Sequence, residues 1–157
     1  MANASAGPIR LFVLGDARIE TPRGVIEPTA ELVFAAALYL ILERKEPVAR
    51  RTLEQLLWPS ASRQSASHRL RQTLLKLRRC GIPVEPVGRS RLQLVSENIV
   101  VDFDEFVRSQ DASIIPEQPL SFLPGYDSGF SFAFAEWLDS RKNEVQTAFS
   151  RLLLRDI

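Results

Sequence analysis

Apolar and polar positions separate onto two sides of the segment Arg63–Arg79 when it is drawn as a helix. The side chains that share the apolar side are Ala66, Leu70, Thr73, Leu74 and Leu77. The opposite side carries His68, Arg71, Gln72, Leu75 and Arg79, and it is flanked by Arg69, Lys76 and Arg78. This division predicts an amphipathic helix that buries one side against a core. We expect the helix to end at Gly81, because glycine tolerates the left-handed backbone of a C-cap.

After Pro83 the pattern changes from helical to extended. Val84–Val87 and Arg91–Val95 have the composition of two strands, and Gly88, Arg89 and Ser90 form the turn between them. The sequence therefore predicts a short hairpin, with arginines at its tip, directly after the basic helix. A helix rich in Arg and Gln and a basic hairpin suit the two surfaces of a DNA groove.

Short alternating segments at the start of the chain predict a small antiparallel sheet. The expected strands are Ile9–Leu14, Ala17–Glu20 and Val25–Glu27. A helix should follow over Ala30–Arg44, with Thr29 as its N-cap and Glu31 in its first turn. Its nearly all-round apolar surface predicts a central, buried helix.

A second helix is expected between this buried helix and the basic one. The second helix has its helical pattern over Ala49–Leu57, and Glu46, Pro47 and Val48 would connect it to the buried helix. Trp58 and Pro59 should end the second helix, and Ser60, Ala61 and Ser62 should form the turn into the basic helix.

The pattern after the hairpin predicts one more strand and further helices. Val100 and Val101 would form the strand, Asp102 would cap a short helix over Phe103–Gln110, and residues 116–129 would form a loop. From Ser131 onward an apolar stripe recurs at helical spacing, at Phe134, Trp137, Leu138, Val145, Phe149 and Leu152 or Leu153. Such a helix needs a partner, so we expect that the chain stops inside a helical repeat domain, or that the helix folds back on the preceding domain. A contact with a second copy or with an effector domain is the alternative.

The elements together predict an α+β fold with an N-terminal antiparallel sheet, a helix-turn-helix, a C-terminal hairpin and the beginning of an all-helical domain. A chain of 157 residues with 45% hydrophobic content can bury one core, or one domain and the start of another. We place the first domain at residues 8–101 and the second at residues 102–157.

Charge is distributed unevenly along the chain, although the formal net charge is only +1. Arg44–Arg91 contains 12 Arg and Lys residues against 3 Glu, whereas the residues after Val95 contain 5 basic and 11 acidic side chains. The basic half would attract a polyanion through counterion release.

The chain shows no charged and apolar leader pattern, and its longest apolar run, Leu32–Leu42, is shorter than the roughly 18 residues of a membrane span. We expect a cytoplasmic protein without membrane contact. Cys80 is the only cysteine, so no disulfide can form within the chain, and its position near a helix end predicts a partly buried filler.

Enzymatic chemistry has little support in the sequence. His68 is the only histidine, no nucleophile and carboxylate stand around it at a familiar spacing, and the glycines are scattered through turns rather than gathered in a phosphate loop. Asp102, Asp104 and Glu105 could suggest a metal site, but carboxylates at this position are typical of a helix start. We therefore expect neither an enzyme nor a cofactor.

The element order and several local sequences resemble the OmpR-type winged-helix domain, in the version found in SARP and AfsR-like regulators of bacterial secondary metabolism. The matching pieces are IRLFVLGDARIE at the start, TLEQLLWPSAS through the second helix, HRLRQTLLKLRRCGI in the basic helix and VVDFDEFV after the hairpin. FLPGYDSGF and FAEWLDSRKNEV resemble the opening of the bacterial transcriptional activator domain that follows in that family. The likeness extends over nearly the whole chain beyond Pro8.

The resemblance implies a transcription regulator, most simply an activator, whose partners are double-stranded DNA and RNA polymerase. Ser65–Arg79 is similar to the helix that enters the major groove, and Gly88, Arg89, Ser90 and Arg91 correspond to the wing that reaches the minor groove. The loop that faces RNA polymerase in such regulators corresponds to Trp58, Pro59, Ser60, Ala61, Ser62 and Arg63. Side-by-side binding of two copies to direct repeats is also implied. Leu92 stands where the family commonly has an aromatic residue, so the packing of the wing is less secure by analogy.

Within this set we assign roles by side-chain chemistry. Arg71, Gln72 and Arg79 are expected to read base edges, and Arg51, Arg63, Arg69, Lys76 and Arg78 to hold phosphates, while Arg89 and Arg91 anchor the wing. Ser65, His68 and Ser90 complete the expected interface. Leu75 could meet a thymine methyl or a protein. A different hypothesis is that the fold is a protein-interaction module whose basic helix docks an acidic partner and binds no DNA.

Overall fold

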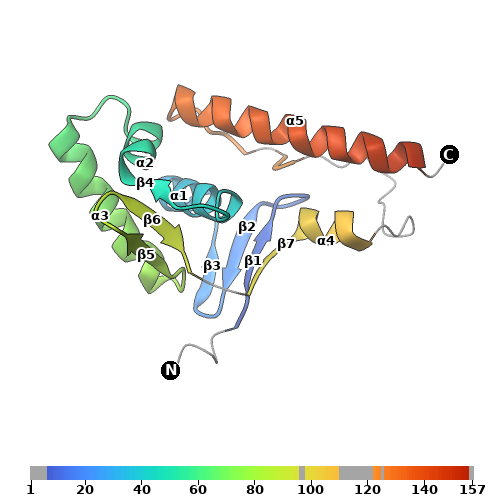
Figure 1. The fold of residues 1–157 in the computed structure, drawn as a ribbon, viewed down its shortest axis with the longest axis horizontal. Helices are drawn as coiled ribbons and strands as arrows, with labels where there is room; N and C mark the ends of the chain where they lie inside the picture. Colours follow the sequence, from blue (N-terminus) through green and yellow to red (C-terminus); the bar gives the residue numbers. More distant parts are fainter. Residues whose placement is uncertain (1–6, 96–97, 110–121, 125, 156–157) are drawn as a thin grey trace.

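The fold is mixed α+β. A computed structural model describes residues 7–95, 98–109, 122–124 and 126–155. Within these residues it contains five helices, a four-stranded sheet and a three-stranded sheet (Figure 1). The strands are β1 (Ile9–Phe12), β2 (Arg18–Thr21), β3 (Gly24–Ile26), β4 (Val48–Ala49), β5 (Val84–Val87), β6 (Arg91–Leu94) and β7 (Ile99–Val101). The helices are α1 (Glu31–Leu42), α2 (Arg50–Leu57), α3 (Arg63–Arg79), α4 (Asp102–Ser109) and α5 (Phe132–Arg155).

The larger sheet has the strand order β3-β2-β1-β7. Its first three strands are antiparallel, as their alternating patterns predict, and Arg10 of β1 pairs with Glu20 of β2. The fourth strand, β7, runs parallel to β1 and pairs Arg10 with Val100. The prediction of a purely antiparallel sheet was therefore incomplete, because the chain returns to this sheet only after the hairpin and enters it in the direction of β1.

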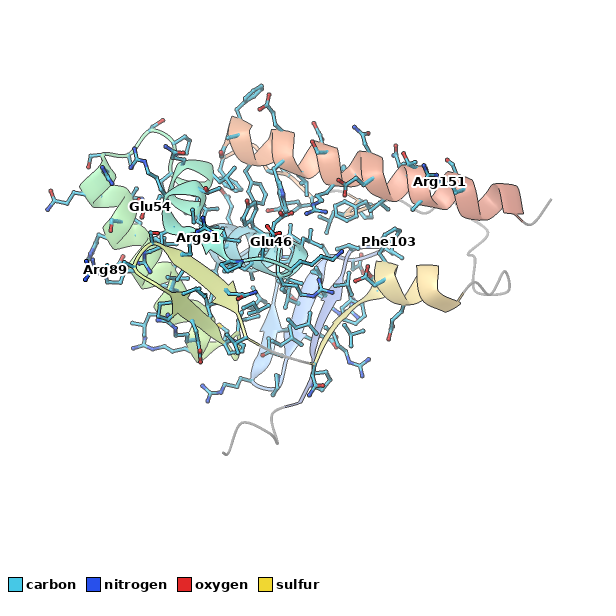
Figure 2. The ribbon with its side chains drawn as sticks, viewed as in Figure 1. Glu46, Glu54, Arg89, Arg91, Phe103 and Arg151 are labelled. Atoms are coloured by element: carbon cyan, nitrogen blue, oxygen red, sulfur yellow. The ribbon has the colours of Figure 1, made fainter. Side chains whose placement is uncertain are left out.

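Helix α1 is the centre of the core. Every side chain from Phe34 to Ile41 is buried, as its all-round apolar surface predicts. The helix packs against α2, α3 and β6, and Figure 2 shows side chains gathered around it between the larger sheet and α5. Thr29 is not its N-cap. The cap position falls on Ala30, which has no side-chain acceptor. The Ala30 amide donates to the Glu27 carbonyl in a turn, and the first helical residue is therefore Glu31.

The predicted connector before α2 contains a strand. Val48 and Ala49 form β4, which pairs antiparallel with Leu92 and Arg91 of β6. The hairpin β5–β6 is thereby built into a three-stranded sheet with the order β4-β6-β5. Leu92 is fully buried, so the hairpin is packed close to its turn even though an aromatic residue is absent there.

Asp102 joins the ends of two adjacent strands of the larger sheet, β1 and β7. Its carboxylate accepts hydrogen bonds from the Val13 and Leu14 amides, with N···O distances of 3.0 and 3.1 Å. Burial raises the pKa of this carboxyl, and the backbone hydrogen bonds offset part of that rise. Asp102 therefore fastens the end of β1 to the start of α4, in addition to opening a helix. Nearby, Asp104 forms an ion pair with Arg44 at 3.3 Å.

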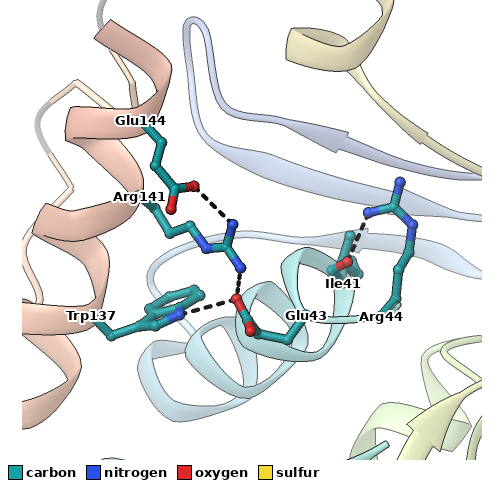
Figure 3. A network of polar contacts seen from close by, with 6 residues as sticks. All are labelled: Ile41, Glu43, Arg44, Trp137, Arg141 and Glu144. Atoms are coloured by element: carbon teal, nitrogen blue, oxygen red, sulfur yellow. Dashed lines mark hydrogen bonds and ion pairs between the residues drawn. The ribbon is translucent and has the colours of Figure 1, made fainter. Parts of the chain in front are cut away.

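Helix α5 folds back on the preceding elements, which was one of the two arrangements expected. Phe134, Leu138 and Val145 are buried, and the rings of Tyr39 and Trp137 lie 4.7 Å apart, centroid to centroid. Figure 3 shows the polar contacts beside these rings: the Trp137 Nε1–H donates to Glu43 over 3.3 Å, and Arg141 forms an ion pair with the same carboxylate. The side chains of residues 149, 152 and 153, and residues 116–121 and 125 of the loop predicted over residues 116–129, lie outside the described residues.

Candidate nucleic-acid interface

The polar side of α3 faces away from the protein core. All five side chains of the predicted apolar side are buried. His68, Arg69, Arg71, Gln72, Leu75, Lys76, Arg78 and Arg79 are all exposed. The helical division drawn from the sequence is therefore confirmed for this element, and the side chains proposed for recognition are free to meet a partner.

In the described part of the chain, the exposed cations of α3 have no acidic partners. Six Arg and Lys residues stand on the 17-residue helix, which has no Asp or Glu. Among the described residues, none of the ion pairs uses a cation of α3 or of the β5–β6 turn. Together these cations form what we call the basic face: Arg63, Arg69, Arg71, Lys76, Arg78 and Arg79 of α3, with Arg89 and Arg91 of the hairpin.

The hairpin is attached to the C-terminal end of α3 by backbone and side-chain hydrogen bonds. The Ile82 amide donates to the Leu77 carbonyl over 2.9 Å, and Arg78 Nε donates to the Val84 carbonyl over 2.9 Å. Gly81 links the two elements with a φ of +95°, and a Cβ there would approach Thr21 Oγ1 to 3.0 Å. Glycine is therefore required at this position both by the left-handed backbone and by the close neighbour.

The tip of the hairpin is exposed and is joined to the start of α2. Gly88 has a φ of +68°, and Arg89, Ser90 and Arg91 are exposed. The Arg50 amide donates to the Ser90 carbonyl over 2.8 Å. Arg51, the next residue along α2, is exposed as well, so the cation predicted on the second helix comes from the end of α2 that adjoins the hairpin tip. Figure 2 shows Arg89 on the same side of the molecule as α3.

The N-terminal end of α3 is capped by its own sequence. Ser62 is the N-cap, and its Oγ accepts a hydrogen bond from the Ser65 amide over 3.1 Å. Ser65 is half-buried, and its Oγ accepts from Arg69 Nε over 3.4 Å. The Ser65 hydroxyl, which we expected to contact a partner, therefore already accepts a hydrogen bond within the helix.

The loop between α2 and α3 exposes only part of its predicted surface. Pro59 and Ser60 are exposed, and Ala61 is half-buried. Trp58 is only 9% exposed, and its indole Nε1 is buried without a hydrogen-bond partner. The large apolar ring of a tryptophan at a helix end is readily buried in the core. The Trp58 side chain is therefore part of the core and not of the exposed surface of this loop.

Two polar residues beside the basic face were not predicted to belong to it. Gln64 is exposed and precedes His68 by four residues, so the helical spacing could have placed it on the same side. Arg23 lies in the turn between β2 and β3, and its guanidinium donates to the Arg79 carbonyl over 3.5 Å. Only the tertiary fold brings Arg23 to α3, so no local pattern could have identified it.

No family model, curated protein or solved structure matches this chain. In the described part of the chain, no group of His, Cys, Asp and Glu side chains is arranged to hold a metal ion. None of the helices in that part is both long enough and apolar enough to cross a membrane.

Proposed function

We propose that this protein is a sequence-specific regulator of transcription that binds double-stranded DNA through a winged helix-turn-helix of the OmpR type. Helix α3 would enter the major groove, and the hairpin β5–β6 would serve as the wing on the neighbouring minor groove. The observation that carries the proposal is the basic face, in which the exposed cations of α3 and of the hairpin have no carboxylate partner among the residues that the structure describes.

The dimensions of α3 support this assignment. A 17-residue helix is about 25 Å long, and a helix about 10–12 Å in diameter fits the roughly 12 Å width of the major groove. The apolar side of α3 is fixed against α1 and α2, so the polar side is held rigidly in one direction. Rigid presentation favours base reading, because hydrogen bonds to base edges require side chains that start from fixed positions.

Side-chain chemistry distinguishes the expected roles along the face. Arg71, Gln72 and Arg79 carry the forked donors and acceptors that match guanine and adenine edges. Arg51, Arg63, Arg69, Lys76 and Arg78 would bind phosphates, and Arg89 and Arg91 would fix the wing. Arg78 can do so while it holds the hairpin, since its Nε bond to Val84 leaves the terminal nitrogens of the guanidinium for other acceptors.

Leu75 supports a second candidate function, a protein-interaction module that docks an acidic partner. This leucine is 46% exposed, and it lies in the middle of the polar side of α3. An exposed leucine surrounded by cations could anchor an acidic amphipathic helix. The same residue could instead contact a thymine methyl group. We favour DNA as the partner because basic residues surround Leu75.

Selection of DNA from a random duplex pool, followed by binding at two salt concentrations, tests the proposal. We expect enrichment of a defined half-site and an affinity that decreases as the salt concentration rises. A pool without enrichment, together with binding that does not depend on salt, would support the interaction module instead. Contacts with RNA polymerase and the pairing of two copies on direct repeats are further proposals, which footprinting on the selected site would test.

A further inference from the structure

An open groove lies beside the C-terminal end of α3, between this helix, the edge strand β3 and the start of α1. Its volume is about 460 Å³, within the roughly 300–1,000 Å³ that is typical of small-molecule sites. Val25, Ile26 and Val33 contribute apolar lining, and Val25 is 55% exposed. An exposed valine on an edge strand gives the groove an apolar wall that solvent can reach.

Two cations of the basic face also line this groove. Lys76 and Arg79 are both exposed, and neither takes part in an ion pair among the described residues. Glu27 is the acidic residue among the lining side chains. The groove therefore combines an apolar wall with a net positive charge at the α3 side, a pairing that suits a ligand with an apolar body and one anionic group.

We propose that this groove binds a small amphipathic organic anion. The apolar body of the ligand would lie against Val25 and Val33, and its carboxylate or sulfonate would meet Lys76 and Arg79. Because these two cations also belong to the basic face, bound ligand and bound DNA exclude one another. The exclusion rests on the proposed function, whereas binding of the anion does not.

The probe for the test is the aromatic sulfonate 1-anilinonaphthalene-8-sulfonate, compared with N-phenyl-1-naphthylamine, which has nearly the same rings without the sulfonate. In titrations of the ¹⁵N-labelled protein, the sulfonate should saturate a single site and shift the amides of residues 25–33 and 76–80. The uncharged amine should bind about tenfold more weakly, because it lacks the charge-assisted contacts. Amide shifts spread over the whole protein, or equal binding of the two probes, would overturn the proposal.

A matched pair of variants separates the groove from the general surface. Val25→Gln should weaken binding of the sulfonate by about tenfold, because it removes an apolar wall. Val95→Gln changes a valine that is similarly exposed, at 51%, and does not line the groove, so it should leave the affinity unchanged. Glu27→Gln removes the lining carboxylate and should strengthen binding several-fold. Equal effects of Val25→Gln and Val95→Gln would contradict the assignment.

Competition with DNA is measured separately, by adding the sulfonate to a protein–duplex complex. We expect the apparent affinity for the duplex to decrease as the groove fills, and the same decrease to require about tenfold more sulfonate in Val25→Gln. If the protein binds no duplex at all, the proposed function fails while the amide shifts still decide the groove. Binding in the groove with no change in duplex affinity would overturn the exclusion.

Discussion

The proposed dependence of DNA affinity on salt can be calculated from the basic face together with Arg51 of α2. Seven exposed cations are assigned to backbone contacts, and none has a carboxylate partner among the described residues: Arg51, Arg63, Arg69, Lys76, Arg78, Arg89 and Arg91. Each neutralised phosphate contributes about −0.9 to the slope of log K against log salt concentration, so the expected slope is about −6. The affinity should therefore decrease roughly 4,000-fold between about 50 and 200 mM salt.

Fluorescence anisotropy of a labelled duplex measures this slope directly. Lys76→Gln should reduce its magnitude by about 0.9 and weaken binding to every sequence alike. Arg151→Gln is the control, because Arg151 is also exposed but lies on α5, at the other end of the molecule from Arg89 (Figure 2). A slope near zero, or equal slopes for Lys76→Gln and Arg151→Gln, would refute the assignment of phosphate contacts to α3.

Three further predictions test recognition, the junction at α4 and the docking of α5. Arg79→Ala should cost about 1–3 kcal/mol on the selected site and relax discrimination; equal losses on random and selected duplexes would contradict base reading. Burial raises the pKa of Asp102, so the folded state holds this proton more tightly than the unfolded state does. The test is the free energy of unfolding, measured by urea titration between about pH 3 and 7 for the wild type and for Asp102→Asn. The difference between wild type and variant should fall as the pH rises through the pKa of Asp102. A rise of this difference would contradict the prediction. Trp137→Ala removes the ring beside Tyr39 and the donor to Glu43, and should lower the free energy of unfolding by about 3 kcal/mol, measured by denaturant titration; an unchanged midpoint would show that α5 contributes no stability.

Helix α3 illustrates what a sequence pattern can predict. Its periodicity identifies every buried side chain between Ala66 and Leu77, because one continuous helix has a fixed pitch and one apolar stripe. The serine at its start and the glycine after its end also act locally, through a cap and a left-handed backbone. The exposed cations on its polar side follow from the same geometry, so most of the candidate interface was predictable.

The features that the pattern missed depend on contacts between distant segments. Val48 and Ala49 form a strand because β6 lies beside them, and two residues are too few to show an alternating pattern. The parallel pairing of β7 with β1, and the hydrogen bonds that the Val13 and Leu14 amides donate to Asp102, join positions about ninety residues apart. Trp58 was assigned to a partner surface, but its side chain is only 9% exposed.

The arrangement around α1 explains how the basic face and helix α5 coexist in one chain. Helix α1 is buried from Phe34 to Ile41. Helix α3 packs against it, and α5 is joined to it through Tyr39 and Glu43. These contacts use the apolar side of α3, so α5 can dock without covering the basic face. Figure 1 shows the same separation, with α5 across the top of the molecule and α3 at its left edge. Helix α5 also packs against α2, and α2 packs against α3, so both helices depend on the central pair α1 and α2.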